Sequence, residues 1–377
     1  CKYCVNRVSN DTQRATFTPE ELAELTIEFY RRNYIEGLFL SSAVLKNADY
    51  TTERMIGVLR LLRYEHNFWG YIHAKVIPGT SPELVYQIGL LADRLSVNVE
   101  LPSESSLVKL APEKERKAIF KPMGMIKNGI VGNKYELAHY NSAPVFASAG
   151  QATQMIVGAT EETDYNIVRL ASGLYDKYSL KRVFYSAYIP AVSDKLLPAV
   201  DTKPPLLREH RLYQADWMLR MYQFKAEEIL NEENPNFNPY MDPKCNWAIN
   251  NMHYFPVDVN KASLETLLRV PGIGPAGARK IVTARRHSKL SMLELKRMGI
   301  VIKRARYFII TVDEKTGVKM DRFQTTKALI DPGCFSFGVE QMSIFDSYSN
   351  NLLHDKGRDN TAERAVEEAA LCLASKL

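Results

Sequence analysis

The sequence has few cysteines and no long apolar segment. It contains 5 cysteines among 377 residues, at positions 1, 4, 245, 334 and 372. They are too few and too scattered for a disulfide framework, so a reducing, cytosolic setting fits best. No uninterrupted apolar run approaches the roughly 18 to 20 residues that a membrane-spanning helix needs, and the first residues show no basic-then-apolar secretion pattern. We therefore expect no membrane role.

Internal repeats and low-complexity blocks are absent as well. Hydrophobic residues make up 46% of the chain and charged residues 24%, a balance that can bury a large core. This composition excludes disorder as a description of the whole chain. The length leaves room for two or three domains.

Strand-like and helix-like segments alternate through the first half of the chain. Thr18, Pro19 and Glu21 supply a cap, a first-turn proline and a capping-box acid, which predict a helix from there through Arg32. Further strands are expected at 37–42, 69–77, 96–101, 155–157 and 182–189, and further helices at 52–65, 81–94, 104–118 and 163–179. The alternation predicts an α/β fold, with a parallel sheet wrapped by helices as a barrel or a doubly wound sheet.

Polar side chains gather directly after these strands. In a barrel, the loops at this end of the strands build the active site. Asn98 and Glu100 are two residues apart, which places both on one face of a strand. The alternative is ordinary barrel core. The polar positions are Ser41, Ser42, His73, Lys75, Asn98, Glu100, Glu161 and Glu162.

We expect four successive parts in the chain. A barrel over residues 1–200 is followed by a helical connector over 201–257, which carries an aromatic and basic stretch at Glu209–Trp217. A compact module over 258–310 and a C-terminal extension over 311–377 complete the chain.

The module holds a glycine-rich turn between two short apolar-periodic helices. The turn is Pro271-Gly272-Ile273-Gly274, and its glycines leave backbone N–H groups uncovered at the start of the second helix. Such a helix start is a ready site for an anion. Residues 261–306 carry twelve Lys or Arg and two Glu, a net charge of +10 in a chain of net charge +6. The basic charge is therefore local.

This pattern resembles the helix-hairpin-helix motif, whose hairpin grips a DNA phosphate backbone without reading sequence. Phosphate contacts position a protein but carry no sequence information, and they make affinity sensitive to salt. The alternative is a helix pair that packs against a neighbour and leaves its basic residues solvated. The resemblance implies nucleic-acid contacts at Gly272, Ile273, Gly274, Ala276, Arg279, Lys280, Arg285 and Arg286.

Two thiols lie three residues apart in Cys1-Lys2-Tyr3-Cys4. Such a pair alone can bind zinc, act as a redox couple or do nothing. Zinc would need two further ligands, and no second Cys-x-x-Cys or His pair is present. A thioredoxin-like pair would need a helix close behind it, which the sequence does not predict.

The cysteine pair resembles the end of the radical S-adenosylmethionine signature, Cys-x-x-x-Cys-x-aromatic-Cys. Cys1, Tyr3 and Cys4 match its last three marked positions. The first cysteine would lie four residues before Cys1, so we expect an N-terminally truncated fragment. In that family three thiolates hold a 4Fe–4S cluster and leave one iron open for the amino and carboxylate groups of S-adenosylmethionine. The resemblance makes Cys1 and Cys4 metal ligands.

The same resemblance implies the fold and the cofactor site. The fold would be a partial (β/α)6 TIM-type radical-SAM barrel, followed by a small all-α helix-hairpin-helix domain. Ser41 and Ser42 stand near the methionine amino group, where a Gly-Glu pair is more usual. Asn98 and Glu100 match positions that touch the ribose, and the segment 155–162 matches the strand beside the adenine. The residues expected to bind S-adenosylmethionine are Tyr3, Ser41, Ser42, Asn98, Glu100, Gly158 and Glu162.

Over residues 1–310 the closer resemblance is to bacterial radical-SAM proteins assigned to DNA modification or repair. It implies a cytoplasmic enzyme that forms a 5′-deoxyadenosyl radical, with an electron donor and a uracil-DNA-glycosylase-like protein as partners. A target base in duplex DNA would be extruded to reach the barrel. The segments that carry the resemblance are Cys1–Arg7, Gly37–Ser42, His73–Gly79, Asn98–Glu104, Arg208–Trp217 and Phe255–Asn260.

Several interpretations stay open. The chemistry could act on RNA such as tRNA, or the chain could be a non-catalytic nucleic-acid-binding protein with a structural or lost cluster. Gln341–Phe345 resembles the peptide that docks on the bacterial sliding clamp, although an ordinary buried turn explains it better. Candidate substrate-side groups, or else packing residues, are His210, Arg211, Tyr213 and Gln214.

Overall fold

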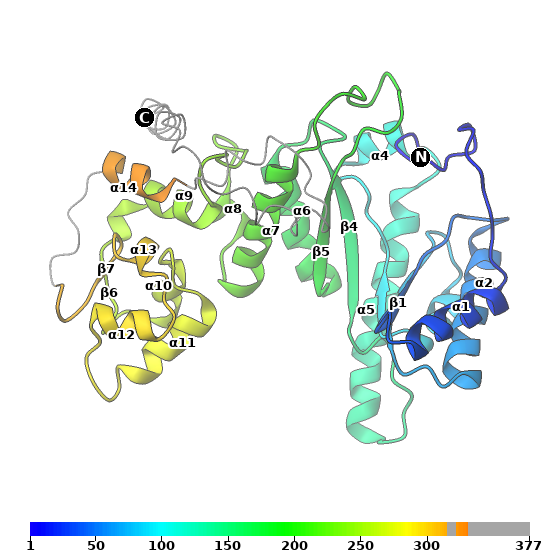
Figure 1. Cartoon of the computed structure of the whole chain (residues 1–377), viewed down its shortest axis with the longest axis horizontal. Coiled ribbons are helices and arrows are strands. Elements are labelled where there is room, and N and C mark those ends of the chain that lie inside the picture. Colours follow the sequence, from blue (N-terminus) through cyan, green and yellow to red (C-terminus); the bar gives the residue numbers. More distant parts are fainter. Residues whose placement is uncertain (315–321, 331–377) are drawn as a thin grey trace. The chain divides into compact units, whose positions relative to one another are not determined.

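The computed structural model of the chain describes residues 1–314 and 322–330. Its contacts divide the chain into two compact units, Cys1–Pro205 and Leu206–Leu377 (Figure 1). Each unit has its own set of helices and strands. The four-part division expected from the sequence stays a prediction.

The first unit is built on a curled, five-stranded sheet in which every neighbouring pair is parallel (Figure 1). The strands follow the order β1-β2-β3-β4-β5, so each strand pairs with its neighbour in the sequence. This arrangement confirms the predicted α/β fold with a parallel sheet. The strands are β1 (Gly37–Leu40), β2 (Tyr71–Lys75), β3 (Arg94–Ser96), β4 (Gln151–Val157) and β5 (Arg182–Ala187).

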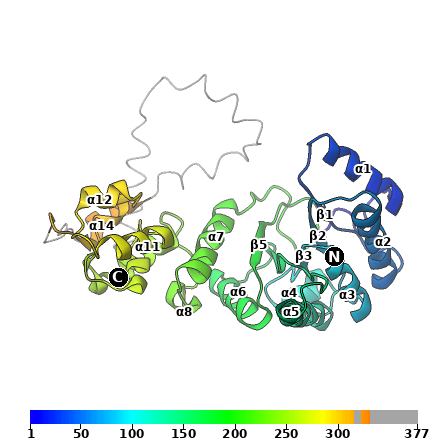
Figure 2. The same cartoon turned by 90° about the horizontal axis from the view of Figure 1, so that it is seen from below.

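Helices connect these strands and cover one face of the sheet (Figure 2). α1 packs on α2, α2 on α3, α3 on α5, and α5 on α6, so the helices form a continuous outer layer. α1 begins as predicted, because Thr18 accepts a hydrogen bond from the Glu21 N–H and the Glu21 carboxylate accepts one from the Thr18 N–H. The helices are α1 (Pro19–Arg31), α2 (Ala48–Arg60) with its π-helical continuation η1 (Leu61–Glu65), α3 (Pro82–Leu91), α4 (Glu104–Leu110), α5 (Arg116–His139) and α6 (Asp164–Tyr178).

Side chains of the strands alternate between the helix-covered face and the opposite face. On β2, Ile72 and Ala74 are fully buried, whereas Tyr71, His73 and Lys75 are exposed or half-buried. Complete burial of an aliphatic side chain of the size of Ile72 stabilises a fold by about 1.5 to 3 kcal/mol. The helix-covered face therefore supplies the core, and the opposite face and the strand ends are left to polar groups.

β3 ends earlier than the sequence predicts. A strand was expected over 96–101, but regular pairing stops at Ser96 because the Thr153 hydroxyl takes the place of ladder partners. This hydroxyl donates to the Val97 carbonyl at 2.7 Å and accepts from the Val99 N–H at 3.0 Å. Pairing resumes at Glu100, whose φ is 66° and whose carbonyl accepts from the Ile156 N–H at 2.7 Å. Residues 97–99 therefore leave the sheet as a loop.

The helix predicted over 104–118 is two helices, and most of the second was missed. Pro112 disfavours helical geometry at Ala111, so α4 ends there. α5 escapes a periodicity search because it contains Pro122 and three glycines. One of them has a packing role: a Cβ on Gly129 would lie 2.7 Å from the Phe146 ring, which also touches Gly89 of α3.

The second unit is mainly helical, but its basic module is not all-α as predicted. Two short strands pair in parallel at the two ends of the module, with the Val257 N–H donating to the Phe308 carbonyl at 2.8 Å. The elements are α7 (Leu206–Met221), α8 (Ala226–Ile229), α9 (Pro243–Asn250), the 3₁₀ turn η2 (Met252–Tyr254), β6 (Val257–Asp258), α10 (Leu264–Arg269), α11 (Pro275–Ala284), α12 (Met292–Arg297), α13 (Ile302–Ala305), β7 (Ile309–Ile310) and α14 (Arg322–Leu329). Within the described ranges, every helix is too short or too polar to cross a membrane.

Replacing Thr153 by Val tests how far the β3 end depends on its hydroxyl. The variant keeps the side-chain shape but leaves the Val97 carbonyl and the Val99 N–H without a partner in a buried place. We expect a loss of about 2 to 4 kcal/mol in the free energy of unfolding, because each unsatisfied buried group costs about 1 to 3 kcal/mol. Urea denaturation, followed through hydrogen exchange of the β4 peptide, measures this loss.

Thr16→Val is the matched control, because Thr16 is exposed and donates no hydrogen bond within the described structure. It should change stability by less than about 0.5 kcal/mol. Equal stability of the two variants would show that the hydroxyl does not hold the strand end.

Candidate functional site

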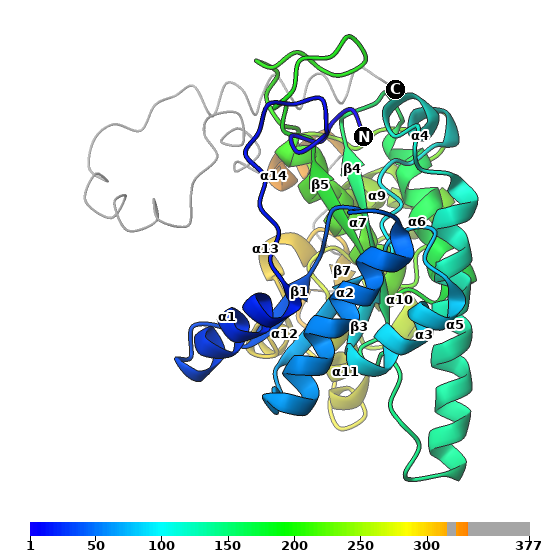
Figure 3. The ribbon, with the colours of Figure 1, turned by 90° about the vertical axis from the view of Figure 1, so that its right-hand side faces the viewer.

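The N-terminal segment lies at the end of the sheet where the strands finish. The Lys2 N–H donates to the Leu110 carbonyl at 2.7 Å, and Arg7 forms an ion pair with Asp194 at 3.5 Å. Figure 3 shows the N-terminus beside α4 and the ends of β4 and β5. The two cysteines therefore lie at the end of a curled parallel sheet where barrels carry active sites.

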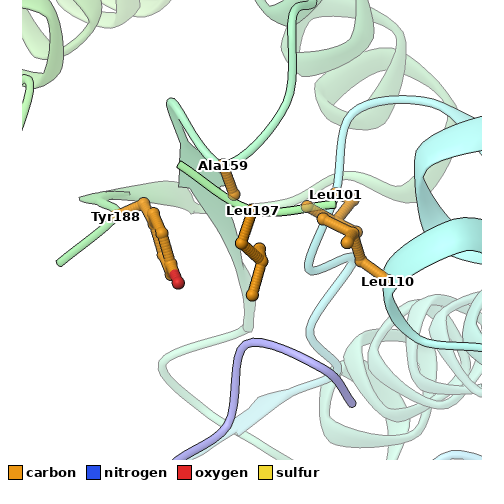
Figure 4. Packing of buried hydrophobic residues seen from close by; sticks show 5 residues of the cluster. All are labelled: Leu101, Leu110, Ala159, Tyr188 and Leu197. Carbon is orange, nitrogen blue, oxygen red and sulfur yellow. The ribbon is translucent and has the colours of Figure 1, made fainter. Parts of the chain in front are cut away.

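Cys1 and Cys4 are half-buried free thiols on a short turn, which closes with a hydrogen bond from the Cys4 N–H to the Cys1 carbonyl at 3.2 Å. Tyr3, between them, packs against an apolar cluster. Figure 4 shows the residues of this cluster. Burial, and then the nearby Glu100 carboxylate, raise the pKa of Tyr3, so its hydroxyl stays protonated. The packing of Tyr3 on the apolar cluster anchors the cysteine turn. The cluster consists of Leu101, Leu110, Ala159, Tyr188 and Leu197.

A cavity of about 190 Å³ lies at the same end of the sheet. One wall is polar and brings together three residues predicted from the sequence, Ser42, Asn98 and Glu100, with two lysines, Lys75 and Lys114. The other wall is apolar, with Ala43, Val44, Val76, Ile77 and Pro78. We call this the strand-end cavity. Polar groups set against an apolar wall are typical of a small-molecule site.

The charges of the strand-end cavity are unequally paired. Lys114 Nζ donates to Glu100 Oε1 at 2.7 Å, and Asn98 Nδ2 donates to Gln154 Oε1 at 3.2 Å. Burial lowers the pKa of Lys75, and the charges of Glu100 and Cys4 oppose this effect only in part. No carboxylate of the described chain lies within ion-pair distance of the Lys75 ammonium group.

Two other predicted cofactor residues, Glu162 and Gly158, are not among the residues that line the cavity. Glu162 accepts hydrogen bonds from Ser103 at 2.6 Å and from Ser106. Burial would raise the pKa of Glu162, but the hydrogen bonds from these serines and from Thr160 outweigh it and lower the pKa. Gly158 has a φ of 84°, and a Cβ there would lie 2.6 Å from Pro205.

Ser41 is exposed and lines a neighbouring groove together with Ser42, against α1 and α2. The sequence analysis placed Lys75 among the polar residues that follow the strands but did not name it as a ligand-binding residue, and it missed Lys114. Lys75 carried a signal, because it is the polar residue that ends β2. Lys114 carried none, because it lies in the turn between α4 and α5 where a continuous helix was predicted.

The predicted hairpin joins α10 to α11 in the second unit. Gly272 has a φ of 83°, and a Cβ at this position would lie 2.6 Å from the Val301 carbonyl oxygen. Ile273 is buried, and its carbonyl accepts a hydrogen bond from Lys244 Nζ at 2.7 Å. Burial lowers the pKa of Lys244 to about 7. Gly274 caps α11 without a side-chain hydrogen bond, which leaves first-turn N–H groups for an anion.

A second hairpin, which the sequence search missed, joins α12 to α13. Its turn contains Gly299, with a φ of 86°, and the Val301 N–H of this turn donates to the Gly272 carbonyl at 3.1 Å. The signal in the sequence is the pair Gly299-Ile300, which repeats Gly272-Ile273. The two hairpins are thus bonded to each other through their backbones.

The predicted basic contacts separate into two kinds. Arg279 and Arg286 are exposed, and no described group accepts a hydrogen bond from their guanidinium groups. Lys280 is exposed too and donates to the Met298 carbonyl of the second hairpin at 3.3 Å. Arg285 instead donates to the Val259 and Ala262 carbonyls at 3.0 and 2.6 Å, which fixes the start of the module. Ala276 is exposed on the first turn of α11.

Arg211, a candidate substrate-side residue, lies inside the second unit. It is 1% exposed and donates to Gln214 at 3.0 Å and to the Pro239 carbonyl at 3.1 Å. Gln214 is also 3.1 Å from the His210 ring nitrogen. These contacts favour the packing alternative.

Comparison with known families agrees with this geometry in the second unit. Residues 254–297 match the helix-hairpin-helix motif, which covers α10, α11 and α12. A comparison with curated proteins finds no match to the chain. The predicted helix-hairpin-helix resemblance is therefore confirmed.

Within the described ranges, no group of three or more His, Cys, Asp or Glu side chains is arranged to hold a metal ion. Gln341–Phe345, Cys334 and Cys372 lie outside the described residues.

The two hairpin glycines offer a matched pair of substitutions. Gly272→Ala places a Cβ at a positive φ and against a backbone oxygen, whereas Gly299→Ala has the same φ and no atom within 4 Å. We expect Gly299→Ala to cost about 1 to 2 kcal/mol and Gly272→Ala about 2 to 5 kcal/mol. Hydrogen exchange of the α10 and α11 peptides in the full chain measures both. Equal costs would show that the hairpins do not pack as described.

Proposed function

We propose that this chain is a radical S-adenosylmethionine enzyme that modifies or repairs DNA. The observation that carries the proposal is the meeting of the Cys1–Cys4 turn and the strand-end cavity at one end of a curled parallel sheet. The same chain carries a helix-hairpin-helix motif. The first feature supports the cofactor chemistry, and the second supports a nucleic-acid substrate.

The thiols fit an iron–sulfur cluster as two of its ligands. Cysteine thiolates are the usual ligands of such clusters, and Cys1 and Cys4 are partly accessible and held on one turn. The resemblance puts the third thiolate four residues before Cys1. Bound there, a 4Fe–4S cluster would supply the electron for reductive cleavage of S-adenosylmethionine.

The chain's own residues would bind and shield the ligand. Ser42 and Asn98 bring hydrogen-bonding groups to the strand-end cavity, and the apolar wall excludes water. Tyr3 would hold the cysteine turn in place because it packs on the apolar cluster. Exclusion of water protects a reactive intermediate from side reactions.

The second unit would hold the DNA through its phosphates. The uncapped start of α11 offers backbone N–H groups, and the exposed arginines Arg279 and Arg286 offer charge. Such contacts carry no sequence information, so the choice of target would lie with the first unit. A target base within a duplex would have to leave the stack to reach the cavity.

The proposal extends to partners and location. An electron donor is required by the chemistry, and the resemblance adds a uracil-DNA-glycosylase-like protein and a bacterial cytoplasmic location. Binding of the sliding clamp through Gln341–Phe345 belongs to the proposal as well.

Salt dependence of DNA binding tests the second unit. For the variant Arg279→Gln/Arg286→Gln, we expect weaker binding to duplex DNA of any sequence. The slope of log affinity against log salt should fall in magnitude by about one for each phosphate that the variant no longer neutralises, and so by about two. Fluorescence anisotropy over a salt series measures the slope.

Lys117→Gln/Lys121→Gln is the matched control, because these lysines are exposed on α5 of the first unit. It should leave the slope unchanged. The same slope in both double variants would remove the hairpin module from the DNA interface, and tighter binding to structured RNA would favour the RNA alternative.

Anaerobic reconstitution tests the enzyme. The chain is prepared with Cys-Xaa-Xaa-Xaa placed before Cys1, and we expect about four irons per chain, the content of one 4Fe–4S cluster. Addition of dithionite and S-adenosylmethionine should yield 5′-deoxyadenosine, detected by chromatography. Cys1→Ala and Cys4→Ala should lose both cluster and product.

Cys245→Ala is the control for these cysteine variants, because Cys245 is buried in the second unit. It should keep the cluster. An extended chain with Cys1 and Cys4 intact that forms neither cluster nor 5′-deoxyadenosine would contradict the catalytic proposal and leave a non-catalytic nucleic-acid-binding protein.

A further inference from the structure

Lys75 of the strand-end cavity is a cation that forms no ion pair within the described residues, although the Glu100 carboxylate acts on it from a longer distance. Lys75 lines the cavity and is half-buried, and its ammonium group makes no hydrogen bond or ion pair within residues 1–314 and 322–330. Desolvating a charge without pairing it costs free energy. A half-buried lysine that forms no ion pair within the protein is suited to bind an anionic group of a ligand.

The charge balance of the cavity supports this conclusion. Its lining holds two lysines and one carboxylate, and that carboxylate is already committed, because Glu100 Oε1 lies 2.7 Å from Lys114 Nζ. One positive charge therefore remains, and it belongs to Lys75. Cys4 lies close enough to influence Lys75 electrostatically, which places the charge beside the cysteine turn.

The size and walls of the cavity narrow the ligand class. A volume of about 190 Å³ is smaller than the roughly 300 Å³ at which whole small-molecule sites begin. The cavity therefore accepts one end of a ligand and leaves the rest outside. Its apolar wall of Val76, Ile77 and Pro78 suits an aliphatic chain next to the anionic group. A carboxylate on a short aliphatic chain, as in an α-amino acid, has this chemistry.

We propose that Lys75 binds the carboxylate of the amino-acid end of S-adenosylmethionine. This inference rests on the proposed function, since it names the residue that would hold one group of the proposed cofactor. Asn98, whose amide is already oriented by Gln154 at 3.2 Å, and Ser42 lie on the same polar wall. The adenosine end of the ligand would then extend out of the cavity.

Binding of two ligands to two variants tests the assignment. S-adenosylmethionine carries the carboxylate, and 5′-methylthioadenosine lacks the whole amino-acid end. Both affinities are measured by equilibrium dialysis on the reconstituted chain without reductant, so the readout is binding and not turnover. Lys75→Met should weaken S-adenosylmethionine binding by about 10- to 100-fold, the range for a lost charged hydrogen bond.

The same variant should leave 5′-methylthioadenosine affinity unchanged and should not lower the melting temperature, because it removes an unpaired charge. Lys75→Arg should keep most of the S-adenosylmethionine affinity. Lys109→Met, at an exposed lysine of α4, is the matched control and should change neither ligand's affinity.

Each other outcome overturns the proposal. Unchanged S-adenosylmethionine affinity in Lys75→Met would show that the lysine does not contact the ligand. An equal loss for both ligands would show a general disturbance of the cavity. If wild type binds neither ligand, the proposed function itself fails; if wild type binds and Lys75→Met binds as well, only the role of Lys75 fails.

Discussion

The candidate cofactor site depends on one hydroxyl group. The Thr153 hydroxyl of β4 forms hydrogen bonds with the Val97 carbonyl and the Val99 N–H. These groups therefore do not pair with a neighbouring strand, and β3 ends before residue 97. The freed loop carries Asn98 and Glu100 to the wall of the cavity. Glu100 is then fixed a second time, through the backbone bridge to β4 and the ion pair with Lys114. A regular strand through these residues would have placed their side chains by the pleat alone.

Features set by neighbouring residues were predictable from the sequence. The Thr18–Glu21 capping box, the alternation of strands and helices, and the first hairpin depend on residues a few positions apart, and the structure has all three. The polar ends of the strands were visible for the same reason, and Asn98 and Glu100 do reach one cavity, although they do so from a loop.

Features set by distant residues could not be predicted in this way. The cavity joins the ends of β1 and β2, the loop after β3 and the turn before α5, and only the folded sheet brings these segments together. α5 depends on Phe146, whose ring fills the space left by Gly89 and Gly129. The turn of the second hairpin is held by a hydrogen bond from the Val301 N–H to the Gly272 carbonyl of the first hairpin. Because this support comes from a distant segment, the local sequence of the second hairpin gives only a weak signal.

The two candidate sites bind anions by different physical means. The hairpin module offers backbone N–H groups and exposed arginines to phosphates in water, where salt screens charges beyond about 10 Å and competes for the nucleic acid. Lys75 is half-buried in a cavity with apolar lining residues, where screening is weaker. Salt should therefore release DNA long before it releases a carboxylate held by Lys75. The proposed enzyme would therefore keep its cofactor while it exchanges one stretch of DNA for another.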